Sequence, residues 1–164
     1  MPKKKLSKIS LTKSKKPSKS KFLTKEQGIA MAQQWADEGI FYYWARCYWP
    51  LPNGGHLNFS QHKYMKPLYK DMSADITAQK GAQTTFSEWQ LARAFWVADK
   101  LRRNAMYIFP ANTQLGDFVQ MRVDPVIEQS EYLRDITARG GLEGKQKAAD
   151  KMSLKRVGNN FVIF

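Results

Sequence analysis

Eight consecutive residues combine a lysine, a glycine and several hydroxyl side chains, in the order Lys80-Gly81-Ala82-Gln83-Thr84-Thr85-Phe86-Ser87. They separate a short stretch, Ile76–Gln79, from a long amphipathic one that begins at Glu88. A loop that binds phosphates needs backbone N–H groups aimed at the phosphates, a lysine ammonium near them and a hydroxyl that can hold magnesium. The residue types of this segment meet these needs, which makes it the first candidate for a functional site.

The spacing departs from the usual phosphate-binding loop, Gly-x4-Gly-Lys-Ser/Thr. Ser87 supplies the final hydroxyl, but Phe86 occupies the usual lysine position and Thr85 that of the second glycine. Spacing alone leaves two interpretations open: a phosphate-binding loop, or a serine that caps a helix after a Lys-Gly turn. Glu88 is interpreted as a favourable charge at a helix N-terminus rather than as a general base.

The segments around this loop alternate between extended and helical patterns. We expect a strand at Ile76–Gln79, a helix over Glu88–Arg103 and a buried strand over Asn104–Phe109, ended by Pro110. This order is that of a βαβ unit. It predicts that Ile76–Gln79 and Ala105–Phe109 lie parallel in one sheet with the helix as crossover. In an open parallel sheet the ligand binds at such a first loop.

The remaining segments predict further helices and a terminal hairpin, which together make the expected fold class α/β. Thr24 and Gln27 form a capping-box pattern ahead of a helix. The other expected elements are helices over Ile40–Tyr48, over Gln61–Met72 with Ser60 as cap, and from Thr113 with a restart at Asp124-Pro125, a loop over 140–151, and strands Ser153–Val157 and Phe161–Phe164 about a turn at 158–160.

Taken together, these motifs resemble the large terminase subunits of tailed phages, in the lambda-like branch. That family has a deviant Walker A loop with its lysine in the first position and an aromatic residue in the seventh. Lys80, Phe86 and Ser87 stand in the first, seventh and eighth positions. The similarity covers about residues 40 to 164 with order and spacing kept, and it extends to His62–Pro67, Tyr107–Ala111, Met121–Ile127 and Lys155–Phe161.

The resemblance implies a P-loop NTPase core of the RecA-like type, an incomplete parallel sheet flanked by helices, over residues 24–164. It implies ATP and Mg²⁺ as cofactors and an ATP hydrolase that translocates phage DNA into a procapsid. Lys80 would be catalytic by neutralising charge on the β and γ phosphates, and Ser87 would hold magnesium. The residues implied to contact the nucleotide are Lys80, Gly81, Ala82, Gln83, Thr84, Thr85, Phe86, Ser87 and, near the adenine, Tyr64.

Two departures from the family pattern bear on this expectation. The family has glycine where Thr85 stands, and glycine permits a positive φ that a β-branched residue disfavours. We therefore expect either an adjusted loop or weakened nucleotide binding. The chain also ends in an apolar strand, which indicates truncation before the family's Walker B strand and nuclease domain. Residues 1–164 alone are expected to be inactive.

The partners implied by the resemblance are double-stranded DNA, the portal protein and the terminase small subunit, with a homo-oligomer assembled on the portal. The expected location is the cytoplasm of the host cell, for a phage-encoded protein. No apolar run approaches the ~20 residues of a membrane span, so no membrane partner is expected.

Charge is distributed unevenly along the chain. The net charge is +13, and ten lysines against one acid, Glu26, lie in residues 1–26. Such a composition predicts that residues 1–23 form a disordered basic tail. This tail either attracts nucleic-acid phosphates without sequence preference or acts as a solubilising leader.

Two further function classes stay open. The first is a basic nucleic-acid-binding protein without enzyme activity, with the aromatic group over residues 41–49 as a stacking platform for bases. The mixed spacing of these aromatics, without interleaved lysines, favours core packing instead. The second is another P-loop ATPase, such as a helicase, because the same core is shared. A downstream strand ending in Asp-Glu would favour an ATPase.

Overall fold

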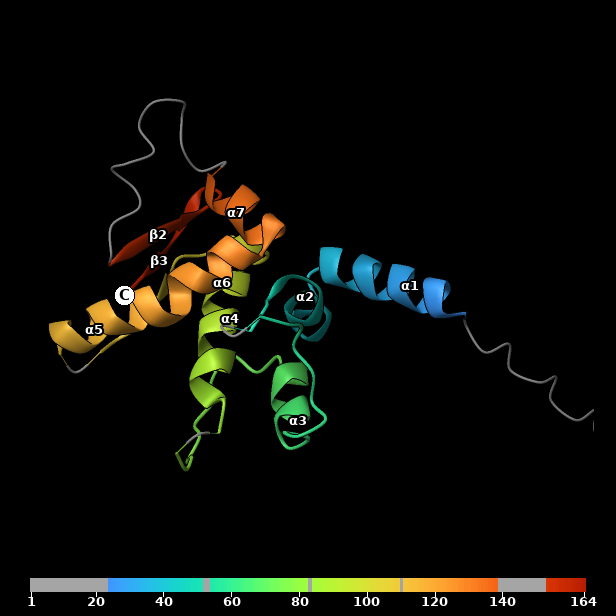
Figure 1. Ribbon diagram of the computed structural model, residues 1–164, viewed down its shortest axis with the longest axis horizontal. Helices are drawn as coiled ribbons and strands as arrows, with labels where there is room; N and C mark the ends of the chain where they lie inside the picture. Colours follow the sequence, from blue (N-terminus) through green and yellow to red (C-terminus); the bar gives the residue numbers. More distant parts are fainter. Residues whose placement is uncertain (1–23, 52–53, 83, 110, 139–152) are drawn as a thin grey trace, which may run out of the picture.

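The computed structural model describes residues 24–51, 54–82, 84–109, 111–138 and 153–164 as helices around a small sheet (Figure 1). The basic segment 1–23, Gln83 and the predicted loop at 140–151 lie outside the described residues. The elements in chain order are α1 Lys25–Asp37, α2 Phe41–Tyr48, α3 Met65–Lys70, α4 Phe86–Asp99, β1 Ala105–Met106, α5 Asn112–Phe118, η1 Val119–Val123, α6 Asp124–Gln129, α7 Glu131–Ala138, β2 Leu154–Val157 and β3 Asn160–Ile163.

The sheet has three strands in the order β1-β3-β2. β1 pairs with β3 in parallel, and the Tyr107 N–H extends this ladder by donating to the Ile163 carbonyl at 2.7 Å. β2 and β3 form the predicted hairpin, whose turn contains Gly158 at φ 58°. Because strands joined by a tight turn must run antiparallel, the sheet is mixed rather than the incomplete parallel sheet that was expected.

The predicted strand at Ile76–Gln79 is also wrong. This segment is irregular and pairs with none of the described strands. Only Ile76 is partly buried, so the segment has no apolar face to cover against a sheet. The residues just before this segment are attached to α4 by the Arg93 guanidinium, which donates to the carbonyl oxygens of Asp71 at 2.8 Å and Ser73 at 2.6 Å. The predicted βαβ unit with α4 as crossover is therefore not formed.

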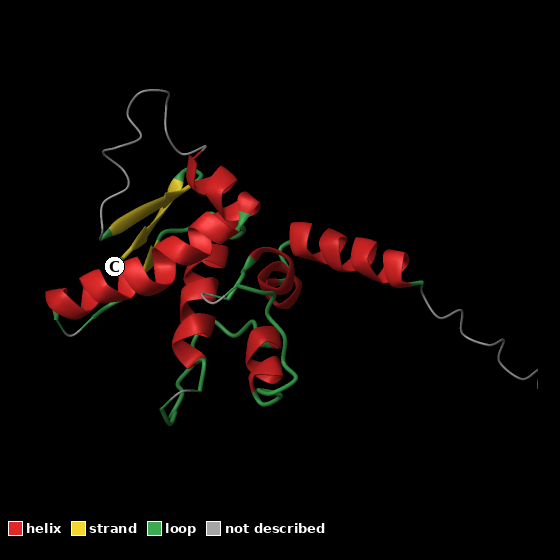
Figure 2. Ribbon diagram, viewed as in Figure 1, coloured by secondary structure: helices red, strands yellow, loops and turns green. Residues whose placement is uncertain are grey.

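Helix α4 is the central element of the fold. It contacts all three strands on one side and α2 on another, which the red and yellow elements of Figure 2 make visible. It begins at Phe86, two residues before the predicted start, and ends at Asp99 rather than at Arg103. The helix cannot continue through Arg102, whose φ of 55° is left-handed.

An aromatic core lies between α2 and α4. Phe41 and Trp96 have ring centroids 5.3 Å apart, as do Trp49 and Phe95, and all four side chains are buried. Their indole N–H groups have partners: Trp96 donates to the Gly39 carbonyl at 2.9 Å and Trp49 to the Glu88 carboxylate at 2.5 Å. The core-packing interpretation of the aromatic group is confirmed.

Two predicted elements are shorter than expected. The helix predicted over Gln61–Met72 is confined to α3, because the Ser60 hydroxyl donates to Asn58 Oδ1 at 2.6 Å instead of capping a helix. The strand predicted over Asn104–Phe109 is confined to β1 and its expected burial is wrong. The side chains of Met106 and Ile108 are 67% and 81% exposed, whereas Ala105, Tyr107 and Phe109 between them are half-buried, so one face of this segment is left uncovered.

Local helix signals were read correctly elsewhere. The Thr24–Gln27 capping box is present, with both reciprocal hydrogen bonds, and starts α1, which projects from the rest of the structure (Figure 1). Pro125 lies in the first turn of α6, which continues α5 through the π-helical turn η1. Within the described residues, no helix has the length and apolar character to cross a membrane.

Candidate functional site

The loop before α4 is held by its own hydroxyl groups. The Thr84 hydroxyl donates to the Gly81 carbonyl at 3.3 Å, and the Thr85 hydroxyl donates to the Thr84 carbonyl at 2.6 Å. Gln83, which the sequence places in the middle of this loop, lies outside the described residues. These hydroxyl groups bond to carbonyl oxygens and do not occupy backbone N–H groups. The loop lies at the N-terminus of α4, where free N–H groups and the helix dipole favour an anion.

Thr85 adopts the left-handed conformation in which the resembling family has glycine. It is the N-cap of α4, with φ 58° and ψ 10°, and no side chain caps the helix. A β-branched residue in this region is disfavoured by about 1–2 kcal/mol. Thr85 therefore holds a conformation that glycine adopts more readily, and both expectations for this position, an adjusted loop or weakened nucleotide binding, stay predictions.

A hollow of about 450 Å³ adjoins the loop. It brings together Tyr64 from the start of α3 with Lys80, Gly81, Thr84 and Phe86 of the loop. The Tyr64 hydroxyl donates to the Thr84 carbonyl at 3.4 Å and lies 2.9 Å from His62 Nδ1. The other lining residues are Met65, Pro67, Leu68, Asp71, Ala78 and Gln79. Tyr64 and the loop are separated by sixteen positions in the chain, and the fold joins them at one concave surface of a size typical for small ligands.

Other predicted site residues do not line this hollow. Ala82 and Thr85 are exposed beside it. Ser87 lies in the first turn of α4 and forms a hydrogen bond with the Tyr107 hydroxyl, which favours ionised tyrosine; burial nevertheless raises the pKa of Tyr107 overall. Ser87 is thus held at the end of β1, beside the hollow rather than in its wall.

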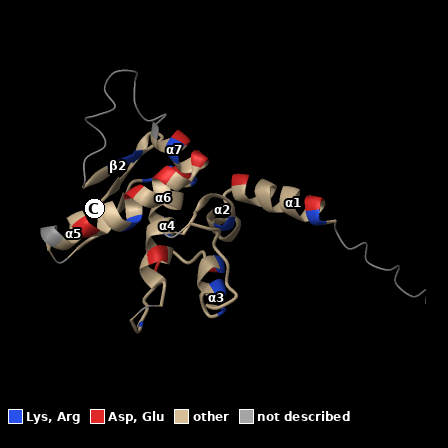
Figure 3. Ribbon diagram, in the orientation of Figure 1, with Lys and Arg blue, Asp and Glu red and all other residues tan. Residues whose placement is uncertain are grey.

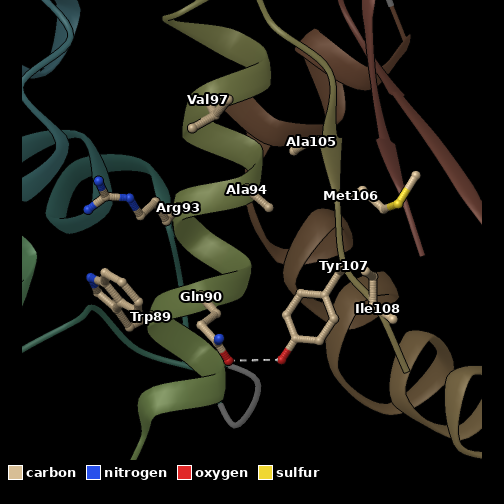
Figure 4. Close-up of a pocket in the computed structure, with 9 residues that line it drawn as sticks. All are labelled: Trp89, Gln90, Arg93, Ala94, Val97, Ala105, Met106, Tyr107 and Ile108. Carbon is tan, nitrogen blue, oxygen red and sulfur yellow. Dashed lines mark hydrogen bonds between the residues drawn. The ribbon is translucent and has the colours of Figure 1, made fainter. Parts of the chain in front are cut away.

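Tyr107 is not among the site residues predicted from the sequence. It follows β1, and its hydroxyl also donates to Gln90 Oε1 at 3.2 Å, joining the end of β1 to the first turns of α4 (Figure 4). The two elements enclose a second hollow of about 490 Å³. Its lining residues are Trp89, Gln90, Arg93, Ala94, Val97, Ala105, Met106, Tyr107 and Ile108. Tyr107 and Gln90 are 17 positions apart, so no local sequence pattern predicts their hydrogen bond.

Glu88 lies at the helix N-terminus as expected, and it has a buried partner that the sequence did not indicate. It lies in the first turn of α4, but its side chain is buried and accepts a hydrogen bond from Trp49 Nε1 at 2.5 Å. Burial raises the pKa of Glu88, while the Trp49 hydrogen bond and the positive charge of Arg122 oppose this shift. The carboxylate therefore anchors α4 to the segment after α2.

The site offers cationic and hydroxyl groups for a phosphorylated ligand. Lys80 is exposed at the rim of the hollow and Ser87 presents a hydroxyl near the helix N-terminus. Among the described residues, no group of three or more His, Cys, Asp and Glu side chains could hold a metal ion. A single hydroxyl still fits magnesium, because this ion usually keeps several waters and takes phosphate oxygens with one or two protein ligands.

Comparisons of the chain with protein-family models, with curated proteins and with solved structures find no match. The geometry of the loop and its hollow therefore carries the functional argument.

Proposed function

We propose that this chain contains the nucleotide-binding loop of an ATP hydrolase that drives viral DNA packaging, as in a terminase large subunit. The observation that carries the proposal is the loop before α4. Its N-cap Thr85 is left-handed, and Lys80, Thr84 and Phe86 share one hollow with Tyr64. These features support the proposal because a phosphate-binding loop needs a cation, a hydroxyl and a strained turn at a helix N-terminus.

In this proposal the phosphates of ATP lie at the N-terminus of α4. Backbone N–H groups of Gly81 to Ser87 bind the phosphate oxygens, and the Lys80 ammonium neutralises charge on the β and γ phosphates. Tyr64 contacts the adenine across the hollow. Ser87 is the magnesium ligand; when bound, magnesium neutralises developing charge on the transferred phosphoryl group.

Tyr107 supports the position of Ser87 in this site. The hydrogen bond between their hydroxyl groups holds the Ser87 side chain at the end of β1. A metal ligand that is oriented by a neighbouring hydrogen bond loses less freedom on binding. Tyr107 is therefore a positioning residue, and the Gln90 carbonyl fixes its hydroxyl from the other side.

Activation of the attacking water needs further acidic residues. In the resembling family these belong to the Walker B segment, which follows the region similar to residues 154–164. We therefore expect residues 1–164 to bind ATP weakly and not to hydrolyse it. The proposed partners of the working motor are double-stranded DNA, the portal protein, the small subunit and further copies of the chain, in the host cell cytoplasm.

Calorimetric titration with Mg-ATP tests the proposal. Lys80→Ala should weaken binding roughly ten- to a hundredfold, because a charge-assisted contact contributes about 1.5–3 kcal/mol. The control is Arg103→Ala, which removes an exposed cation away from the hollow. In a longer protein with ATPase activity, Lys80→Ala should abolish most turnover, and Phe86→Lys in the same chain should restore part of it.

Equal affinities of the wild type and Lys80→Ala would contradict this role of Lys80. Absence of any Mg-ATP binding by the wild type would favour the second function class, a basic nucleic-acid-binding protein without enzyme activity. That alternative is supported by the ten lysines of residues 1–26.

A further inference from the structure

A stretch of 32 residues between Glu38 and Asp71 contains no acidic side chain. Its four basic residues are Arg46, Lys63, Lys66 and Lys70. The acids of the described chain are concentrated elsewhere, on α1 and on α4 to α7, whereas α3 carries basic residues alone (Figure 3). The structure thus has a positively charged region formed by α2, by α3 and by Lys63, which lies between these two helices in the chain.

The four cations lie close to one another. Lys63, Lys66 and Lys70 are exposed and line one hollow of about 590 Å³ together with Pro67 and Asp71. Lys66 and Lys70 are four positions apart in α3 and therefore lie on one face of that helix, and Lys63 lies in the turn before it. Arg46 of α2 and Lys70 of α3 lie near the same aromatic ring. The Arg46 guanidinium is 5.6 Å from the centre of the Tyr42 ring, and Lys70 Nζ is 5.3 Å from it.

These cations are not neutralised within the described chain. None of the four forms an ion pair with a described carboxylate. The one acid at the hollow, Asp71, accepts a hydrogen bond from the Ser73 N–H at 2.8 Å. Exposed, closely spaced cations repel one another, which raises the free energy of the free protein and favours a polyanion as partner.

We propose that Arg46, Lys63, Lys66 and Lys70, the basic face, bind the phosphate backbone of double-stranded DNA without reading its sequence. Binding releases counterions from the duplex as each lysine neutralises a phosphate. The Tyr42 ring cannot stack on bases, because it is only 7% exposed and is flanked by Arg46 and Lys70. The face therefore contacts phosphates rather than unpaired bases.

An anionic membrane fits the basic face less well. A helix that binds a membrane surface inserts an apolar face between the headgroups. Within α3 the large apolar side chains Met65 and Tyr69 are buried in the core at 3% and 2% exposure, and the exposed Tyr64 and Met72 lie at opposite ends of the helix rather than in one continuous face. Charge is therefore the main feature left for recognition, and a duplex presents a dense row of phosphates.

This assignment adds a location to the proposed DNA partner, and it rests on charge and geometry rather than on the nucleotide loop. The two sites are neighbours, because Pro67 and Asp71 line both hollows. The basic face can nevertheless be tested without nucleotide, so that its failure and the failure of the ATP proposal are separate results.

The test is a fluorescence anisotropy titration of a mixed-sequence DNA duplex at several salt concentrations, with the full chain and no nucleotide. The variant is Lys63→Gln/Lys66→Gln, which leaves the Lys70–Tyr42 contact intact. The slope of log K against log salt should fall in magnitude by about 2, since each lost phosphate contact removes about 0.9, and affinity at low salt should fall roughly tenfold or more.

The matched control is Arg103→Gln/Arg134→Gln, which removes the same charge from exposed positions outside the basic face. Its slope should fall by less than about 1. Equal changes in the two double variants would overturn the inference, because only net charge would then matter. An unchanged slope in the lysine variant, or loss of binding to phosphatidylserine vesicles with DNA binding retained, would overturn it as well.

Discussion

The aromatic core between α2 and α4 and the loop before α4 adjoin the same helix, yet they differ in burial and in the source of their hydrogen bonds. In the core, Phe95 and Leu91 are fully buried and Trp96 donates a hydrogen bond from its indole. In the loop, Lys80 and Thr85 are exposed, and the hydrogen bonds are made by the loop's own hydroxyl groups. The comparison indicates that stability and site are divided along α4: its body fixes the fold, and its first turn is left available to a ligand.

The largest effect expected from this division is in the core. Phe95→Ala should lower the free energy of unfolding by about 3–5 kcal/mol, because it removes a buried ring and leaves a cavity. Urea denaturation measures the loss. Ile29→Ala on α1, where the side chain is 60% exposed, should change stability by less than about 0.5 kcal/mol. A loss below about 1 kcal/mol at Phe95 would show that α4 is not anchored as described.

A smaller effect of opposite sign is expected in the loop. Thr85→Gly should raise the free energy of unfolding by up to about 1 kcal/mol, because glycine adopts φ 58° without the cost of a β-carbon. Thr84→Gly is the matched control, since Thr84 has no positive φ; it should lose about 0.5–1 kcal/mol. If both variants were destabilised alike, the left-handed conformation of Thr85 would be in error.

The hydrogen bond between the end of β1 and the first turns of α4 should contribute slightly less to the free energy of unfolding. A double-mutant cycle with Tyr107→Phe and Gln90→Ala should give a coupling free energy of about 0.5–1 kcal/mol, the range for an exposed or half-buried hydrogen bond. Thermal or urea unfolding of the four proteins measures it. Strict additivity would mean that the Tyr107 hydroxyl does not link the two elements.

The smallest effect is expected from pH at Glu88. Burial raises the pKa of this carboxyl, so the folded state holds the proton more tightly than the unfolded state. The sign follows: stability is highest below the ordinary glutamate pKa of 4.5 and declines as pH rises through the higher folded value. Glu88→Gln keeps an oxygen acceptor for Trp49 and carries no proton, so its stability should lack this decline.

Urea denaturation of the wild type and Glu88→Gln at a series of pH values provides the measurement. The difference in unfolding free energy should grow in favour of the variant as pH rises. A difference that stayed constant with pH would show that Glu88 is not desolvated in the folded state.

Sequence reasoning succeeded where the deciding contacts are local. The Thr24–Gln27 capping box, the turn at Gly158 and the helix start at Pro125 each depend on residues within a few positions. The core was likewise readable, because the aromatics of residues 41–49 lacked the interleaved lysines of a stacking surface.

It failed where the deciding contact is distant in the chain. Ile76–Gln79 has a strand-like pattern, but a strand needs a partner, and the described sheet offers it none. Glu88 does lie in the first turn of α4, as predicted, but its burial and its partner Trp49, 39 positions away, could not be predicted from the local pattern. The strand over Asn104–Phe109 was expected to be buried, and it is not, because the pattern of a strand does not reveal which of its faces the fold covers.

The central claim is that the loop before α4 binds the phosphates of ATP, and amide NMR of the isotopically labelled chain tests it most directly. On titration with Mg-ATP, the amide signals of Gly81, Thr84 and Ser87 should shift, together with that of Tyr64 across the hollow. Lys80→Ala should reduce these shifts at equal ligand concentration. Unchanged loop signals, with shifts confined to the hollow between Gln90 and Tyr107 or absent altogether, would contradict the account.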